Sequence, residues 1–437
     1  MTLENIKKIY HKFFRSSFAK SIALITGGTV FAQAMGILFS PIITRIYPPE
    51  QYGVLTTYTA VLGLIVIIAS LSYQKAIPIA EDDEKAINVM ALSVIILVII
   101  VFAITLLIYI AEDFVLKILN SEDIKTYKYL IPVGVFFAGL YNIIIEWNFR
   151  KRSYKTIAKN KVVQSLTSNF TKIVLGILKF GPIGLIIGQI LGQSAGITAL
   201  SRPVFNQKGL LSRISFSEIK KVAKRYVKFP FFSAPSNYVY TAGNNLPVVF
   251  LASLFGNAVT GLFGLARGIT ELPMNLIGNS VAQVFYSEAA NIGKSNPREI
   301  KRLSIKLIRK LALIALLPLV TLLLFGPWLF SFVFGNQWYE AGVYARILSV
   351  MVYFHFIILP IGRILEIFER QREGLILNII RLAMILTVFY ISRAINLTSY
   401  QTVALYSLSN SITYIALLII VIKIMNSEIK TKEKKMA

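Results

Sequence analysis

The stretch LSVIILVIIVFAITLLIYI, residues Leu92–Ile110, decides the fold class because it carries no charged side chain along its whole length. A bilayer core is about 30 Å thick and requires about 20 apolar residues of α-helix. A soluble domain has no need of so long an apolar run, so this segment is expected to cross a membrane. The composition of the 437-residue chain agrees, with 55% hydrophobic and 15% charged residues.

On both sides of this segment, the hydropathy pattern predicts about twelve membrane-spanning helices and therefore an all-α polytopic membrane protein. Several of these spans begin or end at Gly or Pro, which punctuate regular structure. The expected spans are Ser21–Ile43, Tyr52–Leu71, Ala86–Ile110, Tyr129–Trp147, Ile157–Leu178, Ile183–Leu200, Phe229–Leu254, Ala258–Ala289, Leu303–Leu329, Ala341–Ile367, Gly374–Ile391 and Thr402–Ile424.

The basic residues are distributed unevenly between the two sets of loops. The side that would hold both termini carries 35 of the 46 Lys and Arg residues, the opposite side carries 6, and 5 fall within spans. Because Lys and Arg collect in loops that stay in the cytoplasm, both termini are predicted to be cytoplasmic. The same asymmetry explains the net charge of +25 without a nucleic acid partner.

The longest polar stretch between spans, Ser201–Lys228, divides the chain almost in half. We therefore expect an N-terminal six-helix lobe over residues 1–200, a basic cytoplasmic linker over 201–228, and a C-terminal six-helix lobe with a basic tail over 229–437. The linker has an amphipathic pattern, so it either lies on the inner leaflet or forms a solvated helix.

Six spans in each half imply that both halves enter the membrane from the same side, as parallel repeats do. A weak similarity between Pro41–Gly53 and Pro247–Gly261 supports a repeat. Two pseudo-equivalent lobes around a central cavity are thus the expected architecture, and it is one that alternating-access transporters use.

Motifs for catalysis are missing from the sequence. It contains two His and no Cys, and it shows no phosphate-binding glycine loop, metal-ligand cluster or nucleophile motif. These absences disfavour an enzyme and exclude an ATP-driven pump within this chain. No metal or cofactor is expected; H⁺ or Na⁺ exchange, or the membrane potential, would supply the driving force.

Several segments resemble the polysaccharide-export flippases of the multidrug/oligosaccharidyl-lipid/polysaccharide (MOP) superfamily, which include O-antigen and capsule repeat-unit flippases. Ile42–Gly53 (IITRIYPPEQYG) is similar to a family signature at the end of the first span. Further similar segments, in the order expected of the family, are Tyr73–Ile87, Trp147–Ala158, Gly184–Gly196, Phe229–Pro235 and Gly335–Tyr344 (GNQWYEAGVY).

The resemblance implies two six-helix lobes and a substrate that is a polyprenyl-pyrophosphate-linked oligosaccharide, moved from the inner to the outer leaflet of a bacterial inner membrane. It also implies a possible polysaccharide polymerase and chain-length regulator as partners. A cavity for such a substrate should offer cations and hydrogen-bond donors at bilayer depth, beside a lateral opening for the lipid tail.

Charged residues inside spans are the first candidates for that cavity, because charge in hydrocarbon is costly. Arg267 and Glu271 are one helical turn apart and could pair, either for substrate binding or for packing. Arg381 has no carboxylate within a turn, so it must face water, a ligand or another helix. Lys172 is a further candidate, although lysine can extend toward the membrane surface.

Polar residues in the first and seventh spans are the second set of candidates. SAPSNYVYTAGNN (Ser233–Asn245) is too polar for a helix that faces lipid, so its amides and hydroxyls are expected to face sugar or other helices. The candidates of this set are Asn237, Tyr238, Asn244 and Asn245 in the seventh span and Gln33 in the first.

A third set of candidates concerns gating and coupling. The signature residues Arg45, Pro49, Glu50 and Gly53 are predicted to lock a turn that closes the outer gate, with a diphosphate contact of Arg45 as the alternative. Two further residues, Arg363 and Glu366, are predicted to form an interfacial or gating ion pair. A coupling proton could be carried by Glu146, although pairing with Arg150 at i+4 is favoured.

Other functions remain open at the level of sequence. A drug/cation antiporter of the same superfamily would want an acidic cavity, whereas the charges within the spans are mainly basic. A membrane-embedded polysaccharide polymerase or acyltransferase is disfavoured by the missing motifs. The sequence does not exclude a scaffold of the polysaccharide assembly machinery that transports nothing.

Overall fold

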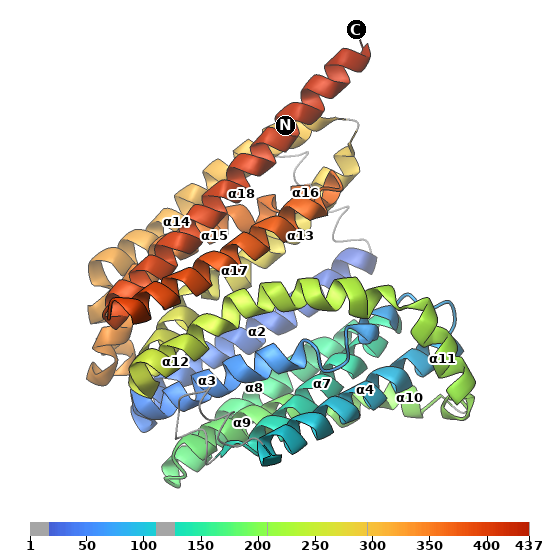
Figure 1. Cartoon of the computed structure of the whole chain (residues 1–437), viewed down its shortest axis with the longest axis horizontal. Coiled ribbons are helices and arrows are strands. Elements are labelled where there is room, and N and C mark those ends of the chain that lie inside the picture. The colour runs from blue at the N-terminus through green and yellow to red at the C-terminus, as the bar shows by residue number, and fades with distance from the viewer. Residues whose placement is uncertain (1–16, 111–126, 208, 295, 437) are drawn as a thin grey trace. The chain divides into compact units, whose positions relative to one another are not determined.

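The computed structural model describes residues 17–110, 127–207, 209–294 and 296–436, and these residues form helices joined by short turns (Figure 1). The basic N-terminal segment and the outer loop before the fourth expected span lie outside the described residues. The described chain divides into two compact units, the first formed by residues 17–46, 61–110 and 127–238, the second by 47–60 and 239–436.

The first unit is a bundle in which α2 packs on α8, α8 packs on α9, and α7 packs on both α4 and α9. Small residues allow these close contacts. A Cβ on Gly28 of α2 would lie 2.6 Å from the Ala158 Cβ of α8, and a Cβ on Gly139 of α7 would lie 2.5 Å from Leu97 Cδ1 of α4. The elements of this unit are α2 (Ser17–Ile46), η1 (Tyr73–Ala76), α4 (Asp83–Ile110), α7 (Leu130–Arg150), α8 (Tyr154–Ile177), α9 (Pro182–Ser194), α10 (Ile197–Phe205), η2 (Leu211–Arg213), α11 (Phe216–Arg225) and η3 (Phe229–Ser233).

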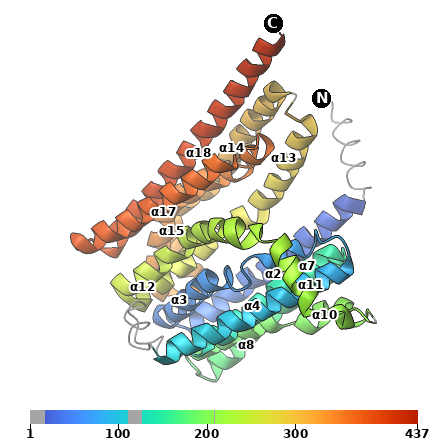
Figure 2. The same ribbon diagram turned by 45° about the vertical axis from the view of Figure 1, so that its right-hand side comes forward.

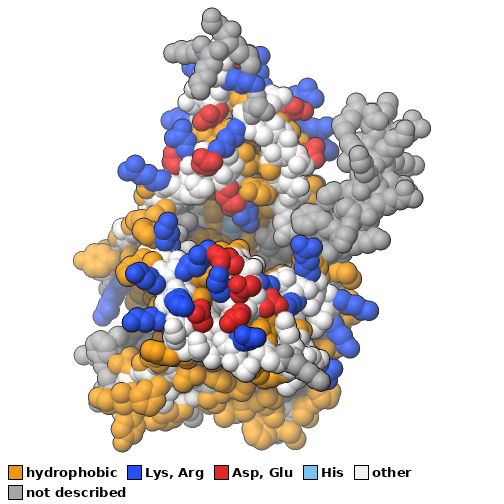
Figure 3. Space-filling view, turned by 90° about the vertical axis from the view of Figure 1, so that its right-hand side faces the viewer, with side chains coloured by type: hydrophobic (Ala, Val, Ile, Leu, Met, Phe, Trp, Pro, Cys, Tyr) orange, Lys and Arg blue, Asp and Glu red, His pale blue; other side chains and the backbone are white. Residues whose placement is uncertain are grey.

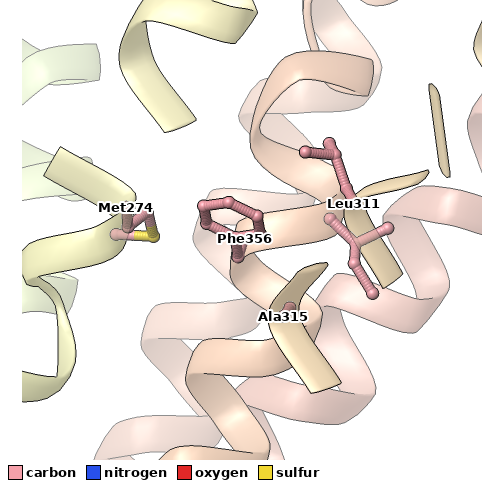
Figure 4. Packing of buried hydrophobic residues seen from close by; sticks show 5 residues of the cluster. Met274, Leu311, Ala315 and Phe356 are labelled. Carbon is pink, nitrogen blue, oxygen red and sulfur yellow. The ribbon is translucent and has the colours of Figure 1, made fainter. Parts of the chain in front are cut away.

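The second unit is a bundle in which α14, α15, α17 and α18 run side by side (Figures 1 and 2). Its elements are the first part of α3 (Pro49–Val66), α12 (Ala234–Thr270), η4 (Met274–Gly278), α13 (Asn279–Ile292), α14 (Pro297–Phe334), η5 (Asn336–Trp338), α15 (Tyr339–Ile361), α16 (Ile364–Ile367), α17 (Gln371–Ala394) and α18 (Ser399–Met436). Figure 4 shows part of its core, where Met274, Leu311, Ala315 and Phe356 meet.

Local sequence signals explain where these helices begin and break. At the start of α14, Asn296 accepts a hydrogen bond from the backbone N–H of Glu299 and donates one to its carboxylate, and Pro297 occupies the first helical position. Within α12, Gly256 has φ 80° and ψ −178°, a conformation that other residues rarely adopt. This break separates the expected spans Phe229–Leu254 and Ala258–Ala289.

Among the described residues, nine helical segments are long and apolar enough to cross a membrane. One of them, Phe229–Thr270, covers the expected seventh span and part of the eighth. The expected second and fifth spans correspond to α3 and α8, which are not among the nine. The first of these helices opens with polar residues and the second contains four lysines, so their mean hydropathy is lower. The number twelve stays a prediction.

The basic linker packs against the first unit. The Asn88 side chain of α4 is fully buried; it donates to the carbonyl oxygen of Arg213 at 3.1 Å and accepts from the backbone N–H of Ser215 at 3.1 Å. On α11, Arg225 pairs with Glu81 and Val222 is 2% exposed. Hydrogen bonding to Lys85 and the nearby charge of Arg225 lower the pKa of Glu81.

The linker is therefore not simply a solvated helix, although its apolar residues Leu211 and Ile214 remain exposed. Figure 3 views the molecule from the side on which α10 and α11 lie in Figure 1. Lys, Arg, Asp and Glu side chains gather on this face.

Candidate functional site

Two arginines of the second unit, Arg381 buried and Arg267 half-buried, are joined by one asparagine. Arg267 on α12 donates from Nη1 to the backbone carbonyl oxygen of Asn244 at 2.6 Å. Arg381 on α17 donates from Nη2 to the side-chain oxygen Oδ1 of the same Asn244 at 2.8 Å. The break at Gly256 lets the two halves of α12 present Asn244 and Arg267 to each other.

Arg381 has no ion-pair partner within the described part of the chain, and its residue is only 7% exposed. Its Nε donates to Oδ1 of Asn410 on α18 at 2.7 Å, and its Cζ lies 5.7 Å from the ring centroid of Tyr414. His355 of α15 stacks on Tyr414 with ring centroids 4.4 Å apart. The guanidinium is thus held by amide oxygens and an aromatic face, which leaves its positive charge uncompensated.

Arg267 forms the expected pair with Glu271, with Nε 2.8 Å from Oε1. The side chains are 18% and 21% exposed, so both can be reached from outside the unit. Together with Arg381, the cluster contains two guanidiniums and one carboxylate. Because a guanidinium presents a rigid fork of donors, it can bind phosphate oxygens in pairs.

An apolar groove of about 480 Å³ lies in the same unit and shares helices α12 and α15 with this cluster. Two of its lining residues adjoin the polar cluster in sequence: Thr270 precedes Glu271, and Phe356 follows His355. The core shown in Figure 4 supplies Ala315 and Phe356. The groove is lined by Ile269, Thr270, Pro273 and Ile277, by Ile314, Ala315, Leu317, Pro318, Leu319, Thr321 and Leu322 of α14, and by Ser349, Val352, Tyr353 and Phe356 of α15.

Other expected residues of the seventh span do not join these contacts. The amide of Asn245 donates to the carbonyl oxygen of Thr241 on its own helix at 3.2 Å. The side chain of Asn237 is half-buried, and Tyr238 is 39% exposed. Of this set, Asn244 is the residue that the structure brings to the arginines.

Lys172 and Gln33 lie in the first unit. The Nζ of Lys172 donates to Oε1 of Gln189 on α9 at 3.0 Å, and its stem packs where a Cβ on Gly188 would be 2.5 Å from Cγ. The lysine is 9% exposed, so it is buried between α8 and α9 rather than extended toward the surface. Gln33 is half-buried on α2, and its side-chain oxygen has no hydrogen-bond partner among the described residues.

The signature turn packs tightly within the second unit. A Cβ on Gly53 would lie 1.8 Å from the carbonyl oxygen of Asn257, and a Cβ on Gly261 would lie 2.0 Å from that of Pro49. The two segments of the weak internal repeat therefore contact each other directly. Tyr52 also meets the buried Trp338 edge to face, with ring centroids 5.4 Å apart, which joins two of the family-like segments.

The charged residues of that signature are more exposed than its glycine. Arg45 donates from Nη1 to the carbonyl oxygen of Pro41 at 3.0 Å, and Glu50 is exposed. Further along the chain, Arg363 Nη1 lies 2.6 Å from Glu366 Oε1, with side chains 50% and 42% exposed. The ion pair exists, and its role in gating stays a prediction.

The favoured pairing of Glu146 with Arg150 is wrong. Arg150 instead donates to Asp83 at 2.9 Å and to the carbonyl oxygens of Ile77 and Ala80. The reason is the turn structure after α3, which brings η1 and the start of α4 to the end of α7. Glu146 is half-buried, and its coupling role stays untested.

Sequence reasoning did not assign three members of the cluster to the cavity: Asn410, Tyr414 and His355. A signal for the first was present in α18, where five polar side chains interrupt an apolar span. They are Ser407, Ser409, Asn410, Ser411 and Thr413, and all are buried.

Known structures with a similar fold are transporters of the MOP superfamily. An inward-facing multidrug resistance MATE family transporter matches with a TM-score of 0.72 and 18% identity, over 92% of this chain and 96% of that chain. The lipid II flippase MurJ in an inward closed conformation matches with a TM-score of 0.72 and 15% identity, over 94% and 90%. A MOP superfamily transporter from Pyrococcus furiosus matches with a TM-score of 0.62 and 15% identity, over 94% and 96%.

These matches define the class: a multi-pass membrane protein, helical throughout its described residues, with the fold of MOP-superfamily transporters. The family follows from the sequence. A family model described as "Polysaccharide biosynthesis protein" matches residues 42–343, and the chain belongs to this family. No curated protein sequence matches the chain significantly.

Proposed function

We propose that this protein is a flippase that moves a polyprenyl-pyrophosphate-linked oligosaccharide, the repeat unit of a surface polysaccharide, from the cytoplasmic to the outer leaflet of a bacterial inner membrane. The observation that carries the proposal is the cluster of Arg267, Asn244 and Arg381. Membership of a polysaccharide biosynthesis family supports a substrate that contains a glycan. The likeness to a lipid II flippase is compatible with a lipid carrier for that glycan.

The diphosphate is the part of the substrate that the arginines would bind. A diphosphate that enters the membrane loses water and needs cationic donors in return. Arg381 has only neutral acceptors, so a phosphate oxygen can replace Asn244 or Asn410 with a gain in charge pairing. Glu271 limits the charge of the empty site and would be displaced from Arg267, or would stay beside it, as the anion binds.

The lipid tail is the part that the apolar groove would accept. The groove carries aliphatic side chains on three helical segments, and several of them, among them Leu317 and Ile277, are exposed at the surface of the second unit. A prenyl chain lying there would keep its methyl-branched carbons out of contact with the polar cluster. One ligand with an anionic head and a long apolar tail fits both features.

The proposed mechanism is alternating access. The lobes 1–200 and 229–437, connected by the linker 201–228, would rock about the substrate so that it is exposed to each leaflet in turn. Proton or sodium exchange, or the membrane potential, would drive the return. Both termini would lie in the cytoplasm, and a polysaccharide polymerase with its chain-length regulator would take the product on the other side.

A drug/cation antiporter is the second candidate, because the match to a MATE family transporter has the same TM-score as the match to the flippase. Fold alone does not choose between them. The chemistry of the cluster does, since two guanidiniums and one carboxylate disfavour a cationic drug. A polymerase or acyltransferase would require catalytic groups that the sequence does not show.

Proteoliposomes test the choice of substrate directly. We expect the purified protein to move a fluorescent polyprenyl-pyrophosphate-linked oligosaccharide between leaflets. The measurement is the fraction of fluorescence that a membrane-impermeant quencher cannot reach, and this fraction should fall as the lipid crosses to the outer leaflet. We expect no uptake of a cationic dye driven by a proton or sodium gradient. Dye uptake without movement of the lipid-linked glycan would refute the proposal in favour of the antiporter.

A photoreactive probe tests the groove separately. A polyprenyl pyrophosphate with a photoreactive group near the end of its tail should label peptides of α14 around residues 314–322 and of α15 around residues 349–356. The matched control is a single-chain phospholipid that carries the same photoreactive group. It should not label these peptides. Labelling that excess unlabelled polyprenyl pyrophosphate fails to reduce would argue against a tail site here.

A further inference from the structure

A hollow of about 480 Å³ in the first unit is lined by three cations and lies outside the cluster described above. Lys155 and Lys159 project from α8, and Arg202 projects from α10. All three are exposed, and none forms an ion pair with a carboxylate of the described residues. The other lining residues are Thr156, Asn160, Val163, Gly196, Ala199, Pro203 and Asn206.

The hollow lies between α8 and α10, and a break in the chain between α9 and α10 sets the position of α10. The chain leaves α9 at Ala195 and enters α10 after Gly196, which has φ 76°. The side-chain amide of Asn160 occupies the space beside Gly196, where an added Cβ would lie 1.6 Å from one of its terminal atoms, and the positive φ also favours glycine. With its amide nitrogen turned to the break, Asn160 donates to the carbonyl oxygens of Ala195 and Gly196, each at 3.2 Å.

Charge in the hollow is unbalanced for a physical reason. Lys155 and Lys159 are four residues apart on one helix, where like charges repel, and Arg202 faces them from the second helix. Three acidic residues of the first unit pair with other cations. Glu81 pairs with Lys85 and Arg225, Asp83 pairs with Arg150 and Lys151, and Glu218 pairs with Lys221.

We propose that this hollow, the α8–α10 basic pocket, binds the phosphate-bearing headgroup of an anionic phospholipid of the cytoplasmic leaflet. Basic pockets between helices on the cytoplasmic side of membrane proteins suit such headgroups. The apolar flank favours a lipid over a free anion, because Val163 lines the pocket and Phe205, beside the lining residue Asn206, is 68% exposed. An acyl chain can pack there while the phosphate meets the cations.

Through this pocket, the amount of anionic lipid in the membrane would affect the stability of the first unit. A headgroup bound between α8 and α10 would neutralise the repulsion of the three cations and hold the break at Gly196 in place. This site lies apart in sequence from the arginines of the second unit and does not depend on the identity of the transported substrate.

The test uses the full-length protein in nanodiscs. Phosphatidylglycerol bound per protein is measured by native mass spectrometry after competition with phosphatidylcholine. Each cation near a membrane surface changes the binding constant about fivefold, so the triple variant Lys155→Ala, Lys159→Ala, Arg202→Ala should bind on the order of a hundredfold more weakly. The matched control, Arg302→Ala, Arg309→Ala, Arg372→Ala, removes three exposed cations of the second unit and should retain binding.

A second variant separates a pocket from general surface charge. Ala199→Trp fills the hollow and keeps all three cations, so it should also lose phosphatidylglycerol while its thermal unfolding in detergent stays cooperative. Equal losses in the two triple variants, or full binding by Ala199→Trp, would overturn the proposal. A pocket that responds to inorganic phosphate by a rise in thermal midpoint, but not to phosphatidylglycerol, would also overturn it, because the ligand would then be a free anion.

Discussion

Asn244 holds the two arginines of the cluster together, because its backbone oxygen accepts from Arg267 and its side-chain oxygen accepts from Arg381. A change of this side chain removes only the second contact. The guanidinium of Arg381 would then lose one of its two amide acceptors inside a helical bundle, where water is a poor substitute.

For this reason Asn244→Ala should lower the free energy of unfolding by about 1–3 kcal/mol and reduce transport of the lipid-linked glycan. The matched control is Asn245→Ala, whose amide bonds only to the carbonyl oxygen of Thr241 on its own helix. The check is thermal unfolding in detergent together with export in cells. If the two variants behave alike, Asn244 has no special role in the cluster.

The residue scale also shows what sequence can and cannot predict. The pair of Arg267 and Glu271 followed from helical spacing and is present. The contact between Asn244 and Arg381 links positions 137 residues apart, so periodicity within one helix contains no information about it. The pairing of Glu146 with Arg150 failed because spacing alone ignored a competing carboxylate, Asp83, which reaches Arg150 from another helix.

At the scale of elements, the close approach of α3 and α12 depends on glycine. The backbone of one helix occupies the space where the other would carry a side chain, as the 1.8 Å distance from a Gly53 Cβ to the carbonyl oxygen of Asn257 shows. The sequence indicated a tight turn at this signature. Hydropathy assigns spans but not their neighbours, so it gives no distance between the turn and its pseudo-repeat.

Gly53→Ala should therefore force the two helices apart and destabilise the protein by about 1–3 kcal/mol. The control is Gly36→Ala on α2, where an added Cβ meets nothing within 4 Å and alanine favours the helix by about 0.5–1 kcal/mol. The two variants should shift the thermal midpoint in opposite directions. A midpoint for Gly53→Ala at or above that of the unmodified protein would show that the contact is not close in the membrane.

Span number illustrates a further limit at this scale. Hydropathy detects Leu92–Ile110 easily because the stretch carries no charged side chain. It is weaker for α3 and α8, whose polar residues are partly turned to other helices; Lys172 is an example, since Gln189 accepts its hydrogen bond. Polar contacts of this kind form between helices and are invisible to an average along one helix.

At the scale of the whole molecule, the uneven distribution of Lys and Arg fixes an expected orientation. Single cysteines can test it because the natural sequence has none. A membrane-impermeant maleimide applied from outside to intact cells should label Asn396→Cys and not Ser212→Cys, both of which replace exposed residues. Ser304→Cys serves as a control that stays unlabelled, because this side chain is fully buried. Labelling of Ser212→Cys from outside would remove the basis for two parallel lobes.

The central claim is that the arginine cluster carries an anionic lipid-linked glycan through the membrane. It is tested most directly by leaflet exchange of a fluorescent polyprenyl-pyrophosphate-linked oligosaccharide in proteoliposomes that contain equal amounts of each variant.

We predict that the double variant Arg267→Ala, Arg381→Ala loses at least 90% of the exchange rate, since each guanidinium contributes on the order of 1.5–3 kcal/mol as a charged hydrogen-bond donor. Lysine at both positions should restore it only in part, because it lacks the paired donors. The control variant Arg302→Ala, Arg309→Ala, which removes two exposed arginines of α14, should exchange normally. Normal exchange by the double alanine variant, with the protein folded, would contradict the account.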